Sequence, residues 1–170
     1  MHFLSTSTLA LLALANTALG AGAVHSSMSK INNDMLATDR SVSSWAGNLL
    51  TVAPVLMRAN SLMGSLKAGT DATKNAGNLT ADEAKNVLDM VTESGNSARQ
   101  LSDTLVGAKS KFSQIPLADV FVAGLMDAFA KRTQEFGAAL NDKMPEAKER
   151  VSAAFESVQD SIGDAAKAYA

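Results

Sequence analysis

Apolar residues recur every three or four positions along almost the whole chain, and this spacing restricts the fold more than any other feature of the sequence. Between residues 27 and 52 the series is Met28, Ile31, Met35, Val42, Trp45, Leu49 and Val52, with Thr38 in the one gap. Such spacing places side chains on one face of an α-helix, and no alternating run of β-branched residues indicates a strand. The sequence therefore predicts an all-α protein.

Prolines and polar capping residues divide the chain into five helical segments. Pro54, Pro116 and Pro145 each suit the first turn of a helix, where the missing N–H has no partner to lose. Thr80 and Glu83 have the spacing of a capping box. We expect helices over residues 27–52, 54–76, 80–112, 116–143 and 145–169. Because amphipathic helices bury their apolar stripes against one another, these segments predict an antiparallel helical bundle of about five amphipathic helices.

Two positions depart from the regular stripes. Ser94 and Gly95 interrupt the third segment, which indicates either a kink or a close approach of another helix. In the fourth segment the stripe is assigned to Phe121, Leu125, Ala128 and Phe136. Phe129 lies one step off that stripe, so we expect it to broaden this face toward solvent or a surface.

The first residues have the pattern of a secretory signal peptide. An apolar segment, Leu9–Ala15, is followed by small residues around Gly20 and Ala23. It is too short to cross a bilayer, which takes about 20 apolar residues, and no later stretch is apolar enough to do so. We expect a signal peptide over residues 1–20, cleaved after Gly20 or after Ala23, and one helical-bundle domain over residues 24–170. The sequon beginning at Asn78 fits a secreted chain and predicts N-glycosylation there.

The residue types that most enzymes use are scarce. The chain has no cysteine, and His25 is the one histidine beyond the predicted signal peptide. This composition disfavours catalytic triads, thiol catalysis and ordinary zinc sites. The formal net charge is −2 with both signs interspersed, so the basic face that nucleic acid requires is missing. We expect no catalysis, no cofactor, no metal and no nucleic-acid partner.

The apolar stripes have a composition that favours an interior able to accept a guest. They contain many small residues, which fill volume poorly, and frequent methionines, whose flexible thioethers suit varied apolar partners. No disulfide can oppose separation of the helices. A simple packed core is the alternative for each residue taken alone. The predicted apolar lining consists of Trp45, Leu49, Met63, Val91, Leu101, Phe121, Leu125 and Phe136.

Several short motifs occur in a fixed order along the chain: Ile31–Asp34, Val42–Gly47, Leu101–Phe112, Leu140–Pro145, Phe155 and Ala168–Tyr169. With the predicted signal peptide and the lack of cysteine, they resemble the fungal hydrophobic surface-binding protein A family, also called cell-wall galactomannoproteins. The resemblance implies a secreted or wall-associated helical bundle without catalytic residues. It implies binding to hydrophobic surfaces, fatty acids inside the bundle of some members, and recruitment of a secreted esterase by some. Certain members carry a long Ser/Thr-rich tail that this sequence lacks, so free secretion is expected over firm wall attachment.

These observations together predict a secreted, non-catalytic protein that holds fatty acids in the bundle interior or adsorbs to apolar surfaces. Burial of about 14 methylenes would contribute roughly 11 kcal/mol, which exceeds an association cost of at least about 4 kcal/mol. The alternative is a structural or interaction protein of the fungal wall or host interface, antigen-like or effector-like, with a dry core.

Overall fold

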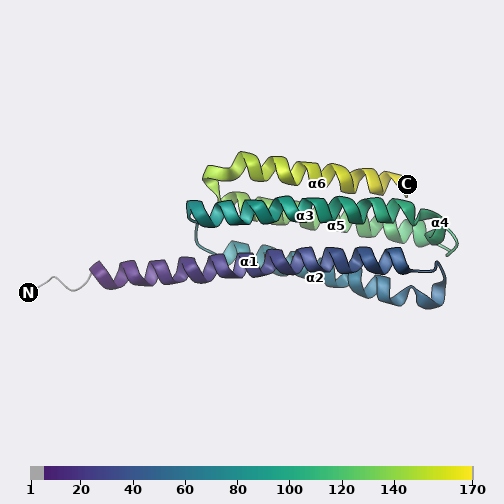
Figure 1. The fold of residues 1–170 in the computed structure, drawn as a ribbon, viewed down its shortest axis with the longest axis horizontal. Helices are drawn as coiled ribbons and strands as arrows, with labels where there is room; N and C mark the ends of the chain where they lie inside the picture. Colours follow the sequence, from purple (N-terminus) through teal and green to yellow (C-terminus); the bar gives the residue numbers. More distant parts are fainter. Residues whose placement is uncertain (1–5, 170) are drawn as a thin grey trace, which may run out of the picture.

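The computed structural model describes the backbone of residues 6–169 and the side chains from Gly20 to Tyr169 (Figure 1). Residues 1–5 of the predicted signal peptide lie outside the described residues. Five long helices dominate: α1 (Thr6–Ser44), α2 (Ala53–Asn75), α3 (Ala81–Gly107), α5 (Ala118–Lys143) and α6 (Lys148–Ala168). Three short elements join them: η1 (Leu49–Thr51), α4 (Lys109–Phe112) and η2 (Pro145–Ala147). The predicted all-α bundle is confirmed.

Local signals in the sequence account for several helix starts. The Thr80 hydroxyl accepts from the Glu83 backbone N–H, and the Glu83 carboxylate accepts from the Thr80 backbone N–H at 2.8 Å, which forms the predicted capping box of α3. Pro54 lies in the first turn of α2, where it costs no hydrogen bond. Helix α3 is continuous through Ser94 and Gly95, so these small residues mark a close approach. A Cβ at Gly95 would lie 3.4 Å from Val158 of α6.

Several predicted helix boundaries are wrong. Helix α1 ends at Ser44 instead of near Val52, because Gly47 adopts a positive φ of 88° and reverses the chain. A side chain at Gly47 would meet Lys111, since an added Cβ would lie 3.1 Å from the Lys111 Cβ. The third predicted helix divides at Ala108 into α3 and the short α4. Helix α5 begins at Ala118 rather than at Pro116, and the last predicted helix splits into η2 and α6. The chain reversal removes Leu49 from the stripe of α1.

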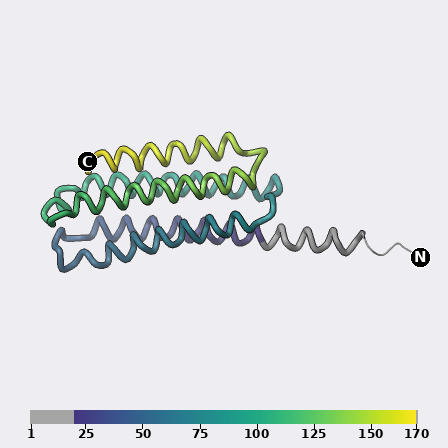
Figure 2. The backbone as a smooth tube through the Cα atoms, turned by 180° about the vertical axis from the view of Figure 1, so that it is seen from behind, coloured from purple at the N-terminus to yellow at the C-terminus, as the bar shows by residue number. Residues whose placement is uncertain are grey.

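The long helices form a closed ring. Helix α1 packs against α2 and α3, α3 against α6, α6 against α5, and α5 against α2. Helices α1, α3 and α6 run in one direction and α2 and α5 in the other (Figure 1), so consecutive long helices are antiparallel. Figure 2 shows from behind that α2 and α5 close the ring. We call the end where α1, α3 and α6 finish the α4 end.

The apolar stripes meet inside the ring. Val24 is the first buried residue among the described side chains, and it follows directly after the later of the two predicted cleavage positions. Glycines let the helices approach closely where the core is tightest. A Cβ at Gly69 would lie 2.9 Å from Ile31 Cδ1, and a Cβ at Gly137 would lie 2.8 Å from Phe155 Cγ. The core therefore depends on these two glycines for its interhelical spacing.

Candidate functional site: two apolar cavities inside the helical ring

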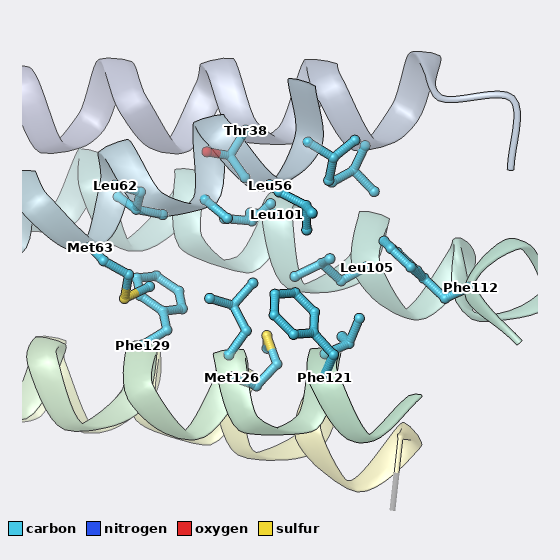
Figure 3. A pocket seen from close by; sticks show the side chains of 15 residues that line it. Thr38, Leu56, Leu62, Met63, Leu101, Leu105, Phe112, Phe121, Met126 and Phe129 are labelled. Carbon is cyan, nitrogen blue, oxygen red and sulfur yellow. The ribbon is translucent and has the colours of Figure 1, made fainter. Parts of the chain in front are cut away.

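The first cavity, which we call the outer cavity, lies inside the ring near the α4 end. Four long helices and α4 line it, and Figure 3 shows Phe121 and Phe129 extending inward from α5 toward Leu101 of α3. Its free volume is about 30 Å³. The lining residues are Thr38, Val42, Val55, Leu56, Ala59, Leu62, Met63, Leu101, Leu105, Phe112, Phe121, Val122, Leu125, Met126 and Phe129. Thr38 is the one polar member, and its hydroxyl donates to the Asp34 carbonyl at 2.7 Å, so the wall presents hydrocarbon.

The second cavity, which we call the inner cavity, follows the outer cavity along the ring axis. All five long helices line it, and its free volume is about 20 Å³. Its lining consists of Met28, Ile31, Met35, Leu66, Val91, Ser94, Gly95, Thr133, Phe136, Phe155 and Val158. About one helical turn separates the two sets of residues, as between Leu62 and Leu66 on α2 and between Phe129 and Thr133 on α5. The two cavities are therefore consecutive spaces along one axis.

The outer cavity reaches the surface between α2 and α5. Leu56 of α2 and Phe121 of α5 both line it, and they are 37% and 53% exposed. Met63 and Leu125, on the same two helices, are half-buried. We call this contact between α2 and α5 the seam. It is the least extensive of the five interhelical contacts in the ring.

Hydrogen bonds of the described side chains cross every helix contact of the ring except the seam. Side-chain hydrogen bonds cross the other four helix contacts, at Lys30–Ser65, Gln100–Asp39, Arg99–Ser157 and Gln159–Ala130. All four ion pairs found in the described part of the chain join residues of the same helix. Among the described side chains, none forms a hydrogen bond between α2 and α5. No described side-chain hydrogen bond or ion pair therefore crosses the seam, and the charge of Arg132 on α5 acts on Asp71 of α2 only at longer range.

Exposed apolar residues gather at the same end of the ring. The large apolar side chains that are exposed within the described residues are Leu49, Leu50, Leu56, Met57, Val106, Leu117, Val120 and Phe121. All eight belong to η1, to the first two turns of α2, to the first turn of α5, to the last turn of α3 or to the turn before α5, and we call them the apolar tip. Grouped exposure of this kind marks interaction sites more often than single exposed residues do.

The backbone at Leu117 supports a role for this surface. Leu117 has a φ of 65° and its side chain is 81% exposed. A left-handed backbone is unfavourable for a bulky residue, and glycine or asparagine would relieve the strain. Packing does not explain a leucine here, because its side chain contacts mainly solvent. An exposed apolar residue held in a strained conformation is typical of a functional surface.

An aromatic cluster braces the α4 end beside the outer cavity. The Trp45 and Phe112 ring centroids lie 4.6 Å apart, and the Phe112 and Tyr169 centroids 6.1 Å apart. The Tyr169 hydroxyl donates to the Leu105 carbonyl. Burial raises the pKa of Tyr169 well above its ordinary value, with a further contribution from Asp119. Trp45 Nε1 donates to the Asn48 carbonyl at 3.0 Å, which ties the turn after α1 to this cluster.

The structure distributes the eight predicted lining residues over three locations. Met63, Leu101, Phe121 and Leu125 line the outer cavity, and Val91 and Phe136 line the inner cavity. Trp45 is buried but lines neither cavity; it packs on Phe112, which does. Leu49 lies on the surface, 63% exposed, as part of the apolar tip. As contacts to a ligand, all eight stay predictions.

The stripe assigned to the fourth predicted helix is partly wrong: Phe136 is buried as expected, but the buried residues in the first half of the helix lie one position after the assigned ones. Phe129, expected toward solvent, is buried at 3% exposure and lines the outer cavity, whereas Ala128 is exposed. The buried series of α5 is Val122, Met126, Phe129, Thr133, Phe136 and Leu140. It has the same three-and-four spacing as the assigned stripe, so the sequence contained the signal but did not distinguish the two faces. Other lining residues that the sequence analysis missed, such as Val55 and Leu105, lie in the predicted helices at ordinary stripe positions.

Within the described residues no group of three or more His, Cys, Asp or Glu side chains could hold a metal ion. No helix in the described part of the chain is long and apolar enough to cross a membrane.

The fold matches solved structures that were determined with bound fatty acids, at low sequence identity. One is AfMp4p in complex with palmitic acid, with a TM-score of 0.85, 16% identity, and coverage of 88% of this chain and 99% of that chain. Ligand-binding domain 2 of Penicillium marneffei MP1, complexed with multiple arachidonic acids, has a TM-score of 0.82, 16% identity, and coverage of 88% and 95%. Ligand-binding domain 1 of that protein, complexed with arachidonic acids, has a TM-score of 0.83 and 11% identity. The match covers 89% of this chain and 99% of that chain.

No curated protein sequence matches this chain significantly. The family model described as hydrophobic surface binding protein A matches residues 21–142. Because this match covers well over half of the chain, the protein belongs to the hydrophobic surface binding protein A family.

Proposed function

We propose that this chain is a secreted, non-catalytic lipid-binding protein that takes a long-chain fatty acid into the ring through the seam. The observation that carries the proposal is the seam itself. It lies beside an apolar cavity, and it is the one ring contact that no described side-chain hydrogen bond crosses. An opening there exposes apolar surface and breaks no side-chain hydrogen bond or ion pair between the two helices as described.

Uptake requires the seam to open. Ligand sites for small molecules usually have volumes of about 300–1,000 Å³, and the two cavities hold about 30 and 20 Å³. The two cavities are therefore about tenfold too small for an acyl chain. Helices α1 and α2 form one hairpin and α5 and α6 another, and α3 contacts both hairpins. We propose that the hairpins separate at the seam while α3 keeps its polar contacts with α1 and α6.

Hydrophobic burial is large enough to drive this binding. About 14 methylenes at about 0.8 kcal/mol each contribute roughly 11 kcal/mol, against at least about 4 kcal/mol for association. The difference of about 7 kcal/mol corresponds to a dissociation constant in the micromolar range, before the cost of opening the seam. The solved structures named above, which carry palmitic or arachidonic acid, support fatty acids as the ligand class.

Adsorption to apolar surfaces is a second proposed activity, and the apolar tip favours it. The tip surrounds the outer end of the seam, since Leu56 and Phe121 belong to both. A lipid-rich surface that covers the tip would bury side chains that water now contacts. The same contact would bring the seam next to the source of the ligand. The family resemblance adds a secreted esterase as a further proposed partner.

Secretion, with or without wall association, completes the proposal. The family match begins at residue 21, and burial begins at Val24, which supports a signal peptide over residues 1–20 and a domain over residues 24–170. Asn78 is exposed in the connection between α2 and α3, where a glycan would be accommodated. A mass shift after endoglycosidase treatment, lost in Asn78→Gln, is the expected result for protein secreted from a fungal host. An unglycosylated secreted protein would contradict this site.

Titration with palmitate tests the lipid-binding proposal directly. Native mass spectrometry of the delipidated protein is expected to show a one-to-one complex, with heat detected by calorimetry. Trp45 emission is expected to shift, because its ring packs on Phe112 at the cavity wall. If palmitate produces no complex, no heat and no shift, and gently purified protein carries no lipid, the dry-core alternative replaces the proposal.

A further inference from the structure

The inner cavity contains two hydroxyl groups that have no hydrogen-bond partner. Ser94 of α3 is 8% exposed and Thr133 of α5 is 4% exposed, and both line this cavity. Neither side-chain oxygen contacts solvent or any donor or acceptor among the described residues. The other buried polar side chains without a partner line neither cavity. Of the two cavities, only the inner one is therefore lined by hydroxyl groups that lack a hydrogen-bond partner.

These hydroxyls do not use the partner that a helix offers. A serine or threonine in a helix commonly donates to the carbonyl four residues earlier. Thr38 and Thr70 do so in this protein, at 2.7 and 2.9 Å. Ser94 and Thr133 form no such bond, although a buried polar group without a partner is unfavourable. Their hydroxyls are available to a group placed in the inner cavity.

The distance from these hydroxyls to the tip matches the length of an acyl chain. Thr133 lies twelve residues after Phe121 on α5, or about 18 Å along the helix. One acyl chain spans about half of a hydrocarbon layer that is roughly 30 Å thick, or about 15 Å. A chain with its head group at Ser94 and Thr133 would pass through the outer cavity and end near Phe121 at the seam.

Charge determines which head group can bind there. No titratable side chain of α1, α2, α3, α5 or α6 lines the inner cavity. An ionised carboxylate would be buried without a cation, whereas a carboxylic acid or an alcohol would stay neutral. Each of these neutral groups can donate to one hydroxyl and accept from the other. The other end of the ring carries charges of both signs, with Asp119 in the first turn of α5, Arg58 on α2, and Lys109 and Lys111 on α4. An ionised carboxylate is therefore better placed at that end than in the inner cavity, which restricts the inner cavity to an uncharged head group.

We propose that the inner cavity is a head-group site, in which Ser94 and Thr133 bind the uncharged hydroxyl-bearing end of a long-chain lipid. The lipid is a primary alcohol or a protonated fatty acid, and its methyl end lies at the seam. This inference rests on the proposed lipid-binding function and adds the orientation of the ligand and the preference for a neutral head.

Quenching of Trp45 distinguishes the two orientations. Trp45 is the only tryptophan and packs on Phe112 at the α4 end. Hexadecanoic acid brominated at carbon 16 is expected to quench Trp45 more strongly than the acid brominated at carbon 6, when both are bound to saturation. Stronger quenching by the carbon-6 compound would overturn the head-inward orientation while leaving lipid binding intact. Failure of both acids to bind would instead reject the proposed function.

One double variant and a matched control test the hydroxyl groups. Wild-type protein is expected to bind hexadecanol about tenfold more tightly than hexadecane, and Ser94→Ala/Thr133→Val is expected to abolish that preference. Thr70→Val is the control, because Thr70 is equally buried but lines neither cavity. The double variant is expected to unfold at the same temperature as wild type or a higher one, since it removes two unpaired hydroxyls. An unchanged preference in the double variant, with palmitate still bound, would refute the head-group site alone.

Discussion

The apolar tip allows a quantitative prediction about adsorption. In the variant Leu50→Ser/Leu117→Asn, two large apolar side chains that are 94% and 81% exposed become polar. Full burial of one leucine contributes about 1.5–3 kcal/mol, so a surface that covers both residues would lose about 3–6 kcal/mol of binding free energy. Because each 1.4 kcal/mol is a factor of ten, the adsorption constant is expected to fall by about two to four orders of magnitude.

Folding stability should not fall in the same variant. Both side chains are already in water, and asparagine tolerates the positive φ at position 117 better than leucine does. Thermal unfolding is therefore expected at the wild-type temperature or slightly above it. This result would separate loss of the surface contact from loss of the fold.

Depletion of protein from solution by alkyl-coated beads provides the assay. The isotherm of the double variant is compared with those of wild type and of Ala68→Ser/Ala128→Ser, which changes exposed alanines of α2 and α5 outside the tip. The control is expected to adsorb as wild type does. If the tip variant adsorbs with wild-type affinity, the tip is not the adsorbing surface and the reasoning fails.

Three further predictions follow from the cavities and the core. Ala59→Leu fills the outer cavity and is expected to weaken palmitate binding at least tenfold in calorimetry, whereas Ala128→Leu on the exposed face of α5 leaves it unchanged; equal affinities would place the ligand elsewhere. Gly137→Ala would put a Cβ 2.8 Å from Phe155 Cγ, whereas the Cβ of Gly124→Ala meets nothing within 4 Å. Both variants gain the same helix propensity, so chemical denaturation is expected to show Gly137→Ala about 1–3 kcal/mol less stable than Gly124→Ala because of this clash. Tyr169 stays protonated in the folded state because burial raises its pKa, so stability is expected to fall as pH rises above about 10, where the unfolded chain releases this proton; Tyr169→Phe should remove that alkaline loss, and an unchanged pH profile would contradict the burial of the hydroxyl.

Local chemistry explains which parts of the fold were predictable. Thr80 and Glu83 cap α3 through contacts three residues apart, so no knowledge of the tertiary structure was needed. Pro54 likewise acts within its own turn. The end of α1 was not predictable in this way. It depends on the positive φ of Gly47 and on Lys111, which is brought to that position by α4.

The sequence predicted which face of most helices points to the interior, but it did not predict which helices lie side by side. Helical spacing identified Leu101 and Phe136 as interior residues, and both line a cavity. It could not show that α3 lies between α1 and α6, which decides the cavity that each residue lines. Ser94 was interpreted only as an interruption of a stripe. Its unpaired hydroxyl depends on Thr133 of a different helix and is visible only in three dimensions.

The seam also has a consequence for how such a domain can evolve. The α1–α2 and α5–α6 hairpins both pack on α3, so the angle between the two hairpins sets the volume of the interior. Substitutions along α2 and α5 could change that angle while the hydrogen bonds across the other four helix contacts hold the remaining helices together. A domain built in this way can change its ligand preference through substitutions at one helix contact, the seam.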